Sequence, residues 1–124
     1  MKPHIQFLKR DDGVRLAYSV LGQGPPFVVP SPWISNLALS FDDPFFMNFW
    51  NEISKSCTII LYDKHGCGQS DRDRKAFTVE SELLDLQSVI EHLQLKKIAL
   101  FGFSMAGPIS IMYASQNQQK VTQD

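Results

Sequence analysis

The segment from Ile98 to Pro108, I-A-L-F-G-F-S-M-A-G-P, holds the residues with the clearest chemical potential. An apolar run leads into Gly102, Ser104 and Ala106, in the spacing G-x-S-x-A. A serine on a sharp turn from a strand to a helix presents its hydroxyl outward, and small residues on both sides permit that turn. The pattern predicts Ser104 as a nucleophile for acyl transfer. The alternative interpretation is an ordinary turn in which Ser104 caps a helix.

The residue after this serine offers a second catalytic group. Met105 stands at the expected start of a helix, where backbone N–H groups point toward bound anions. Its N–H is a candidate donor to the oxyanion that forms during acyl transfer. Gly107 is assigned to the structure of the same turn.

A serine hydroxyl is a poor nucleophile until a base removes its proton. In this arrangement an acid and a histidine follow the serine along the chain. After Ser104 the sequence has no histidine, and its only carboxylate side chain is Asp124. We therefore expect the 124-residue chain to be inactive by itself.

The elements that must position this segment follow from hydrophobic periodicity. Short apolar runs alternate with segments of helical period, which is typical of α/β proteins. The runs Phe27–Val29, Thr58–Tyr62 and Ile98–Phe101 are continuous, as in strands buried on both faces. They predict the parallel centre of a mostly parallel sheet with flanking helices. The first two flank Asp11-Asp12-Gly13 and predict a hairpin. The predicted strands are Ile5–Leu8, Val14–Leu21, Phe27–Val29, Thr58–Tyr62 and Ile98–Phe101.

Three helices are predicted around these strands. Asp43 is a favourable N-cap with Pro44 at the first helical position. A second helix begins after Thr78, and a third begins at or just after Ser104. The apolar side chains of the first helix share one face, which we expect to cover the sheet: Phe45, Phe46, Phe49, Trp50 and Ile53.

Composition restricts the class of protein. The chain has 124 residues, 44% hydrophobic residues and a net charge of -1, as expected for one globular domain without a nucleic-acid partner. Charged residues interrupt the start of the sequence, and no run reaches membrane-spanning length. We therefore expect no signal peptide and a cytoplasmic protein without a membrane partner. Cys57 and Cys67 lack metal-type spacing and are interpreted as thiols, with a disulfide as the minor alternative. No metal or other cofactor is expected.

Four segments, in order, resemble the α/β-hydrolase fold family from about Gly13 to Val121: V-V-P-S-P-W-I-S-N-L, F-D-D-P-F-F-M-N-F-W, L-Y-D-K-H-G-C-G-Q-S-D-R and G-F-S-M-A-G-P. The resemblance is closest to members in which such a domain accompanies adenylate-cyclase or LuxR-type regulators. It implies a serine hydrolase with Ser104 as nucleophile, acting on an ester, lactone or similar acyl substrate. It also implies that Met105 and the loop around Trp33 each supply one oxyanion N–H.

Two positions depart from the family pattern. Ala106 replaces a glycine of the usual G-x-S-x-G, and His65 stands where arginine is usual in the D-x-R-G-x-G-x-S loop. In that loop Gly66 and Gly68 are expected to let the backbone turn, and Asp63 to organise the loop by hydrogen bonds. His65 is interpreted as structural, and a role as base is the less favoured alternative.

The resemblance covers the first half of the family's fold and ends after the elbow helix. It predicts one truncated domain, residues 1–124, in which Ile98–Phe101 lacks its outer neighbour. A bare strand edge and uncovered sheet faces favour self-association into a homo-oligomer, or a partner that supplies the missing half. The alternative function is a non-catalytic binding or interaction module that retains this half of the fold. The residues do not specify which acyl compound would be the substrate.

Overall fold

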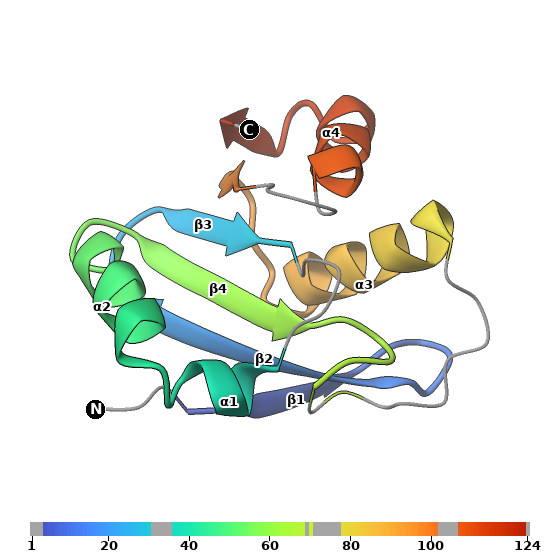
Figure 1. The fold of residues 1–124 in the computed structure, drawn as a ribbon. Coiled ribbons are helices and arrows are strands. Elements are labelled where there is room, and N and C mark those ends of the chain that lie inside the picture. Colours follow the sequence, from blue (N-terminus) through green and yellow to red (C-terminus); the bar gives the residue numbers. More distant parts are fainter. Residues whose placement is uncertain (1–3, 31–35, 69, 71–77, 102–106, 124) are drawn as a thin grey trace.

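One mixed sheet of six strands forms the centre of the computed structural model, which describes residues 4–30, 36–68, 70, 78–101 and 107–123. The strand order is β1-β2-β4-β3-β5-β6 (Figure 1). The strands are β1 (Gln6–Lys9), β2 (Arg15–Gly22), β3 (Pro26–Val29), β4 (Thr58–Asp63), β5 (Ile98–Leu100) and β6 (Val121–Gln123). The helices are α1 (Leu37–Ser40), α2 (Pro44–Ile53), α3 (Val79–His92) and α4 (Gly107–Gln116). The predicted α/β architecture is confirmed.

The pairing of the strands also agrees with the sequence. β1 and β2 form an antiparallel hairpin, and its turn is closed by the Arg10 N–H donating to the Val14 carbonyl at 2.8 Å. β2 pairs antiparallel with β4, whereas β4, β3, β5 and β6 run parallel to one another. The predicted hairpin and parallel centre are therefore both present.

The expectation that β5 lacks an outer neighbour was wrong. β6 pairs with it in parallel, with Ile98 opposite Val121, and the Ile98 N–H donates to the Lys120 carbonyl at 2.7 Å. A ten-residue helix and a short turn are enough to return the chain to the sheet, so the residues after Ser104 hold one more strand. Within the described residues, the outermost strand on this side is β6.

Local capping signals fix where two helices begin. Asp43 caps α2, and its side chain accepts a hydrogen bond from the Phe45 N–H at 3.0 Å. Thr78 caps α3 and forms a reciprocal capping box with Ser81. Such caps satisfy N–H groups that have no partner inside the helix. Both predicted helix starts are confirmed.

The helices cover the sheet in two layers (Figure 1). α3 and α4 pack on one face, where Leu86, Val89 and Ile90 of α3 join the core that contains Ile98 and Leu100 of β5. α1 and α2 pack on the other face, over a separate core that contains Val29, Ile59, Leu61, Leu37, Phe41 and Trp50.

The apolar face predicted for α2 covers the sheet only in part. Trp50 is buried, and Phe46 and Ile53 are partly buried. Phe45 and Phe49 instead point outward, with 82% and 46% of their surface exposed. Successive residues of a helix are rotated by about 100° around its axis. The apolar side chains of α2 therefore span a wider arc than the part of the helix that contacts the sheet. The expectation for these two residues was wrong.

Among the described residues, no helix combines the length and the apolar character that crossing a bilayer requires.

Candidate active site

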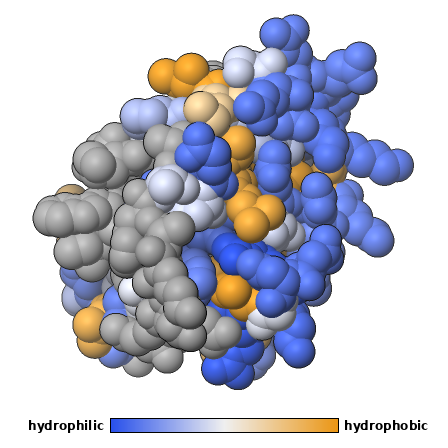
Figure 2. All heavy atoms as spheres, turned by 90° about the vertical axis from the view of Figure 1, so that its right-hand side faces the viewer, coloured by the Kyte–Doolittle hydropathy of each residue, from blue (hydrophilic) through white to orange (hydrophobic). Residues whose placement is uncertain are grey.

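The carboxyl ends of β3, β4 and β5 lie at one edge of the sheet, because these strands run parallel. Ligand sites of open α/β sheets form outside this edge. Figure 2 views the molecule from the side to which the arrows of β3 and β4 point in Figure 1. There, hydrophilic side chains of the described residues surround a smaller number of hydrophobic ones.

The predicted nucleophile segment connects β5 to α4. β5 ends at Leu100 and α4 begins at Gly107, so the order of strand, short connection and helix that the elbow needs is present. The orientation of the Ser104 hydroxyl stays a prediction. Residues 102–106 of this connection lie outside the described residues, as does Trp33 of the expected oxyanion loop. The predicted site residues among them are Gly102, Ser104, Met105 and Ala106.

Gly107, assigned from the sequence to the structure of this turn, is the first residue of α4. A Cβ atom added at Gly107 would meet no atom within 4 Å. Pro108 follows in the first turn of the helix, where a missing N–H breaks no intrahelical bond. Packing therefore does not require glycine at position 107.

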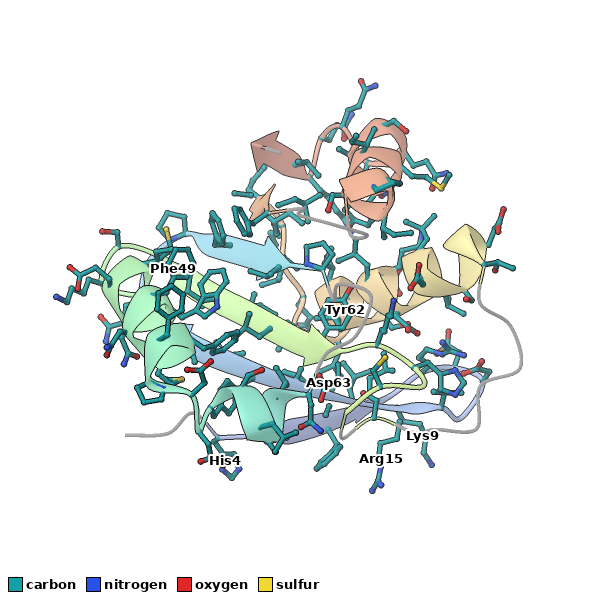
Figure 3. The ribbon with its side chains drawn as sticks, viewed as in Figure 1. His4, Lys9, Arg15, Phe49, Tyr62 and Asp63 are labelled. Carbon is teal, nitrogen blue, oxygen red and sulfur yellow. The ribbon has the colours of Figure 1, made fainter. Side chains whose placement is uncertain are left out.

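Asp63 connects the end of β4 to α1. It is fully buried, and its carboxylate oxygens lie 3.2 and 3.1 Å from the Leu37 N–H that donates to them. Leu37 begins α1, four residues after Trp33 in the sequence, so Asp63 holds the start of the helix that follows the expected oxyanion loop. Figure 3 labels Asp63, the last residue of β4. These hydrogen bonds agree with the architectural role predicted for Asp63.

The segment after β4, residues 64–68 and 70, is called the β4 loop here. Gly66 and Gly68 have φ angles of 94° and 51°, which side-chain-bearing residues rarely adopt. A Cβ atom at Gly68 would also lie 2.0 Å from Asp63 Oδ2. The prediction that these glycines are structural is confirmed, and Gly68 is required by close approach as well as by conformation.

Ser70 fastens the β4 loop to the neighbouring strand. Its hydroxyl donates to the carbonyl oxygen of Asp63 and accepts the Ala17 N–H at 2.8 Å. Ser70 is 3% exposed, so both hydrogen bonds lie away from water. The loop is thereby attached to β2.

His65 lies in the β4 loop and is 9% exposed. Its backbone N–H donates to Asp85 Oδ2 at 2.8 Å, while Asp85 Oδ1 accepts Arg10 Nη1 at 2.5 Å. Burial raises the pKa of the Asp85 carboxyl above its ordinary value, and the hydrogen bonds from His65 and Arg10 oppose that rise. The backbone contact supports the structural interpretation of His65.

Further ion pairs surround this contact. Lys64 pairs with Glu82, and Arg10 pairs with Asp12. The hydrogen bond from Arg10 lowers the pKa of Asp12 to about 2. Together with Asp85, these residues form what we call the ionic cluster, which joins the hairpin turn, α3 and the β4 loop.

Sequence reasoning missed the ionic cluster. One signal was available, because Asp85 lies four residues before the buried Val89 and therefore on the apolar side of α3. The other two histidines lie outside the ionic cluster. His4 and His92 are both exposed, and His92 Nε2 lies 3.3 Å from the hydroxyl oxygen of Tyr18.

A family model described as alpha/beta hydrolase fold matches residues 31–123, which is most of the chain. The chain belongs to the α/β-hydrolase fold family. The AB hydrolase superfamily protein YisY of Bacillus subtilis is 31% identical over 113 residues, covering 90% of this chain and 40% of YisY. A proline iminopeptidase of Lactobacillus acidophilus is 41% identical over 58 residues, covering 44% of this chain and 20% of that enzyme. This member of the family therefore spans less than half the length of either relative.

Solved structures show the same fold. An esterase, EaEST, from Exiguobacterium antarcticum has a TM-score of 0.77 and 27% identity, and the match covers 94% of this chain and 42% of the esterase. A hydrolase from Pseudomonas aeruginosa PA01 has a TM-score of 0.82 and 19% identity, covering 95% of this chain and 43% of that hydrolase. In both comparisons the match covers less than half of the solved structure.

Proposed function

We propose that this chain carries the nucleophile of a serine hydrolase that acts on an ester, lactone or similar acyl substrate. The observation that carries the proposal is the passage from β5 to α4 through G-F-S-M-A-G, in a member of the α/β-hydrolase family. EaEST is named an esterase, and the Lactobacillus relative is named a peptidase. Esters and peptides are both acyl compounds, which suits a serine nucleophile.

In the proposed reaction, Ser104 Oγ bonds to the carbonyl carbon while its proton passes to a histidine. The negative charge on the carbonyl oxygen is stabilised by the N–H of Met105 and by an N–H of the Trp33 loop. The leaving group departs with the proton from the histidine. Water then attacks the acyl-serine in the same way and releases the acid. The hydrogen bond between Asp63 and Leu37 supports this scheme, because it fixes the end of the Trp33 loop.

The proposed activity depends on a histidine and an acid that activate Ser104. The residues after Ser104 contain no histidine, so the scheme needs a histidine and its acid from other residues. His65 is buried in the β4 loop and its backbone is held by Asp85, which favours a structural role over that of a base. We therefore propose that the 124-residue chain has no Ser104-dependent activity by itself. A cytoplasmic location and a closer relation to domains of adenylate-cyclase or LuxR-type regulators stay predictions.

The test joins this chain to the part of YisY that it does not match, and assays p-nitrophenyl ester hydrolysis with Ser104→Ala as the matched control. The folded chimera should lose at least about 100-fold in rate on Ser104→Ala, because the triad and oxyanion groups act together. The 124-residue chain and its own Ser104→Ala variant should be indistinguishable. A folded chimera without Ser104-dependent turnover would favour the non-catalytic module instead. Robust Ser104-dependent turnover by the 124-residue chain would make His65 the base to test.

A further inference from the structure

A hollow lies at the edge of the sheet where the parallel strands β5 and β6 begin, opposite the edge that carries the candidate active site. It is formed by the end of α3, the connection from α3 to β5 and the turn from α4 to β6 (Figure 1). Its volume is about 480 Å³, within the range of about 300–1,000 Å³ that small-molecule sites occupy. Three lysines and two glutamines contribute to its lining: Lys96, Lys97, Lys120, Gln94 and Gln119.

Hydrogen bonds hold the walls of the hollow together. The Ile98 N–H donates to the Lys120 carbonyl oxygen at 2.7 Å. Lys97 Nζ donates to the Gln119 carbonyl oxygen. The Lys120 N–H in turn donates to the Asn117 carbonyl oxygen at 2.9 Å, which closes the turn from α4 to β6. The two connections are therefore fixed to each other in the isolated chain, so a ligand would meet a preformed site.

The charge of the lining favours an anion. It includes three lysine ammonium groups and one carboxylate, that of Glu91, so three positive charges minus one leave a local excess of two. The whole chain has a net charge of -1, so this excess departs from its overall balance. Each ammonium group carries three hydrogen-bond donors, and lysine is a common ligand of phosphate groups. Lys96 and Lys97 are exposed and Lys120 is half-buried, which leaves them accessible to a small ligand.

Gln94 gives a second, independent indication of a ligand. Its φ angle is 55°, and it is the only non-glycine residue with a positive φ among those that the structure describes. It ends α3 in a motif in which its N–H donates to the Glu91 carbonyl and the Leu95 N–H donates to the Ile90 carbonyl. Glycine is the usual residue at this position of the motif, so a glutamine there is strained. Strained residues concentrate at ligand sites, and the exposed Gln94 side chain lines the hollow.

We infer that this hollow binds a small molecule that carries a diphosphate group, with Lys96, Lys97 and Lys120 donating to its phosphate oxygens. An excess of two positive charges matches a diphosphate better than a neutral or singly charged ligand. The Gln94 amide donates a further hydrogen bond. Leu95 is half-buried and offers an apolar contact to the organic part of the ligand. The inference goes beyond the proposed hydrolase activity and does not depend on it.

Isothermal titration calorimetry at fixed ionic strength measures the binding of inorganic diphosphate to the 124-residue chain, with sulfate as the comparison anion. Diphosphate should bind at least about tenfold more tightly than sulfate, because it carries more charge and more acceptor oxygens. The double variant Lys96→Gln with Lys120→Gln should weaken diphosphate binding by at least about tenfold. The double variant Lys9→Gln with Lys55→Gln is the matched control, because it removes the same charge from exposed lysines outside the hollow. It should change the Kd by less than about twofold.

The variant Gln94→Gly separates binding from stability. Glycine adopts a φ near 55° without strain, so this variant should unfold at a higher urea concentration than the unsubstituted chain. It should nevertheless bind diphosphate at least about threefold more weakly, because the amide donor is gone.

Three results would overturn the inference. The first is the absence of saturable diphosphate binding. The second is binding that the double lysine variant and its matched control weaken equally, because the effect would then reflect total charge rather than the hollow. The third is sedimentation of the chain with vesicles that contain phosphatidic acid, without binding of free diphosphate, because the occupant would then be a membrane surface. None of these measurements uses turnover, so a failure of the proposed activity would be seen separately.

Discussion

The β4 loop, with Asp63 just before it, and the exposed side of α2 flank the same sheet, but their side chains have different surroundings. Asp63 and Ser70 are buried, and they accept hydrogen bonds from backbone N–H groups of α1 and β2. On α2, Phe45 and Phe49 are exposed to solvent. Substitutions in the first region, or in the residues that contact it, should therefore lower the stability of the isolated chain. Substitutions in the second should leave that stability nearly unchanged.

The strongest way to break the first region is Asp85→Ala. The substitution leaves the Arg10 guanidinium, 8% exposed, and the His65 N–H without the carboxylate that they contact. Removing one member of a buried ion pair typically costs about 3–5 kcal/mol. We expect urea denaturation to show a loss of this size in the free energy of unfolding.

Two comparisons control this experiment. The double variant Arg10→Met with Asp85→Leu should lose less stability than Asp85→Ala, because it removes both charges together. Phe45→Ser, on the exposed side of α2, should change the free energy of unfolding by less than about 0.5 kcal/mol. If Asp85→Ala were as mild as Phe45→Ser, the contrast between the two regions would be wrong.

Two glycines allow a similar comparison between a crowded position and an open one. Gly68→Ala should lower the free energy of unfolding by about 1–3 kcal/mol, because φ is 51° and the new Cβ would press on Asp63. Gly107→Ala should be neutral, or more stable by up to about 1 kcal/mol, because Gly107 begins α4 and its added Cβ would meet no atom. Thermal and urea unfolding of both variants measure the difference. Equal losses of stability would show that the φ angle and the close contact at Gly68 do not distinguish it from Gly107.

Local signals explain why much of the fold could be predicted. The caps at Asp43 and Thr78 and the apolar runs of the strands are each contained within a few consecutive residues. β6 carried no such signal, because V-T-Q is short and two of its three residues are polar. It becomes a strand through backbone pairing with β5. The exposure of Phe45 and Phe49 depends on where α2 touches the sheet, which the helical period alone does not determine.

Around the candidate site, features set by neighbouring residues could also be predicted, whereas contacts between distant residues could not. Gly66 and Gly68 were predicted because their motif is contiguous in the sequence. The contact between Arg10 and Asp85 joins residues 75 positions apart, and only the fold brings them together. An acid on the apolar side of α3 could have indicated a buried partner, but it could not have named Arg10.

A smaller loss than that of Asp85→Ala is expected at the rim of the ionic cluster. The Arg10 guanidinium lowers the pKa of Asp12 to about 2 from an ordinary value of 3.8. A pKa lowered by folding means that ionised Asp12 stabilises the folded chain above about pH 4, and that this contribution is lost as the pH falls toward 2. Because the Asp12 side chain is 51% exposed, water and salt limit the contribution to less than about 1 kcal/mol.

Unfolding of Asp12→Asn and the unsubstituted chain, measured between neutral pH and pH 2, tests this contribution. Asparagine keeps an oxygen that can accept the Val14 N–H, a contact of 3.3 Å, but it carries no charge for Arg10. The difference in the free energy of unfolding should therefore be present near neutral pH, shrink in high salt, and disappear near pH 2. Asp85 titrates in both proteins, so comparing them removes most of its own pH dependence. A difference that stays constant across this range would mean that Asp12 acts through its shape and hydrogen bonds rather than its charge. The ionic cluster would then end at the buried pair of Arg10 and Asp85.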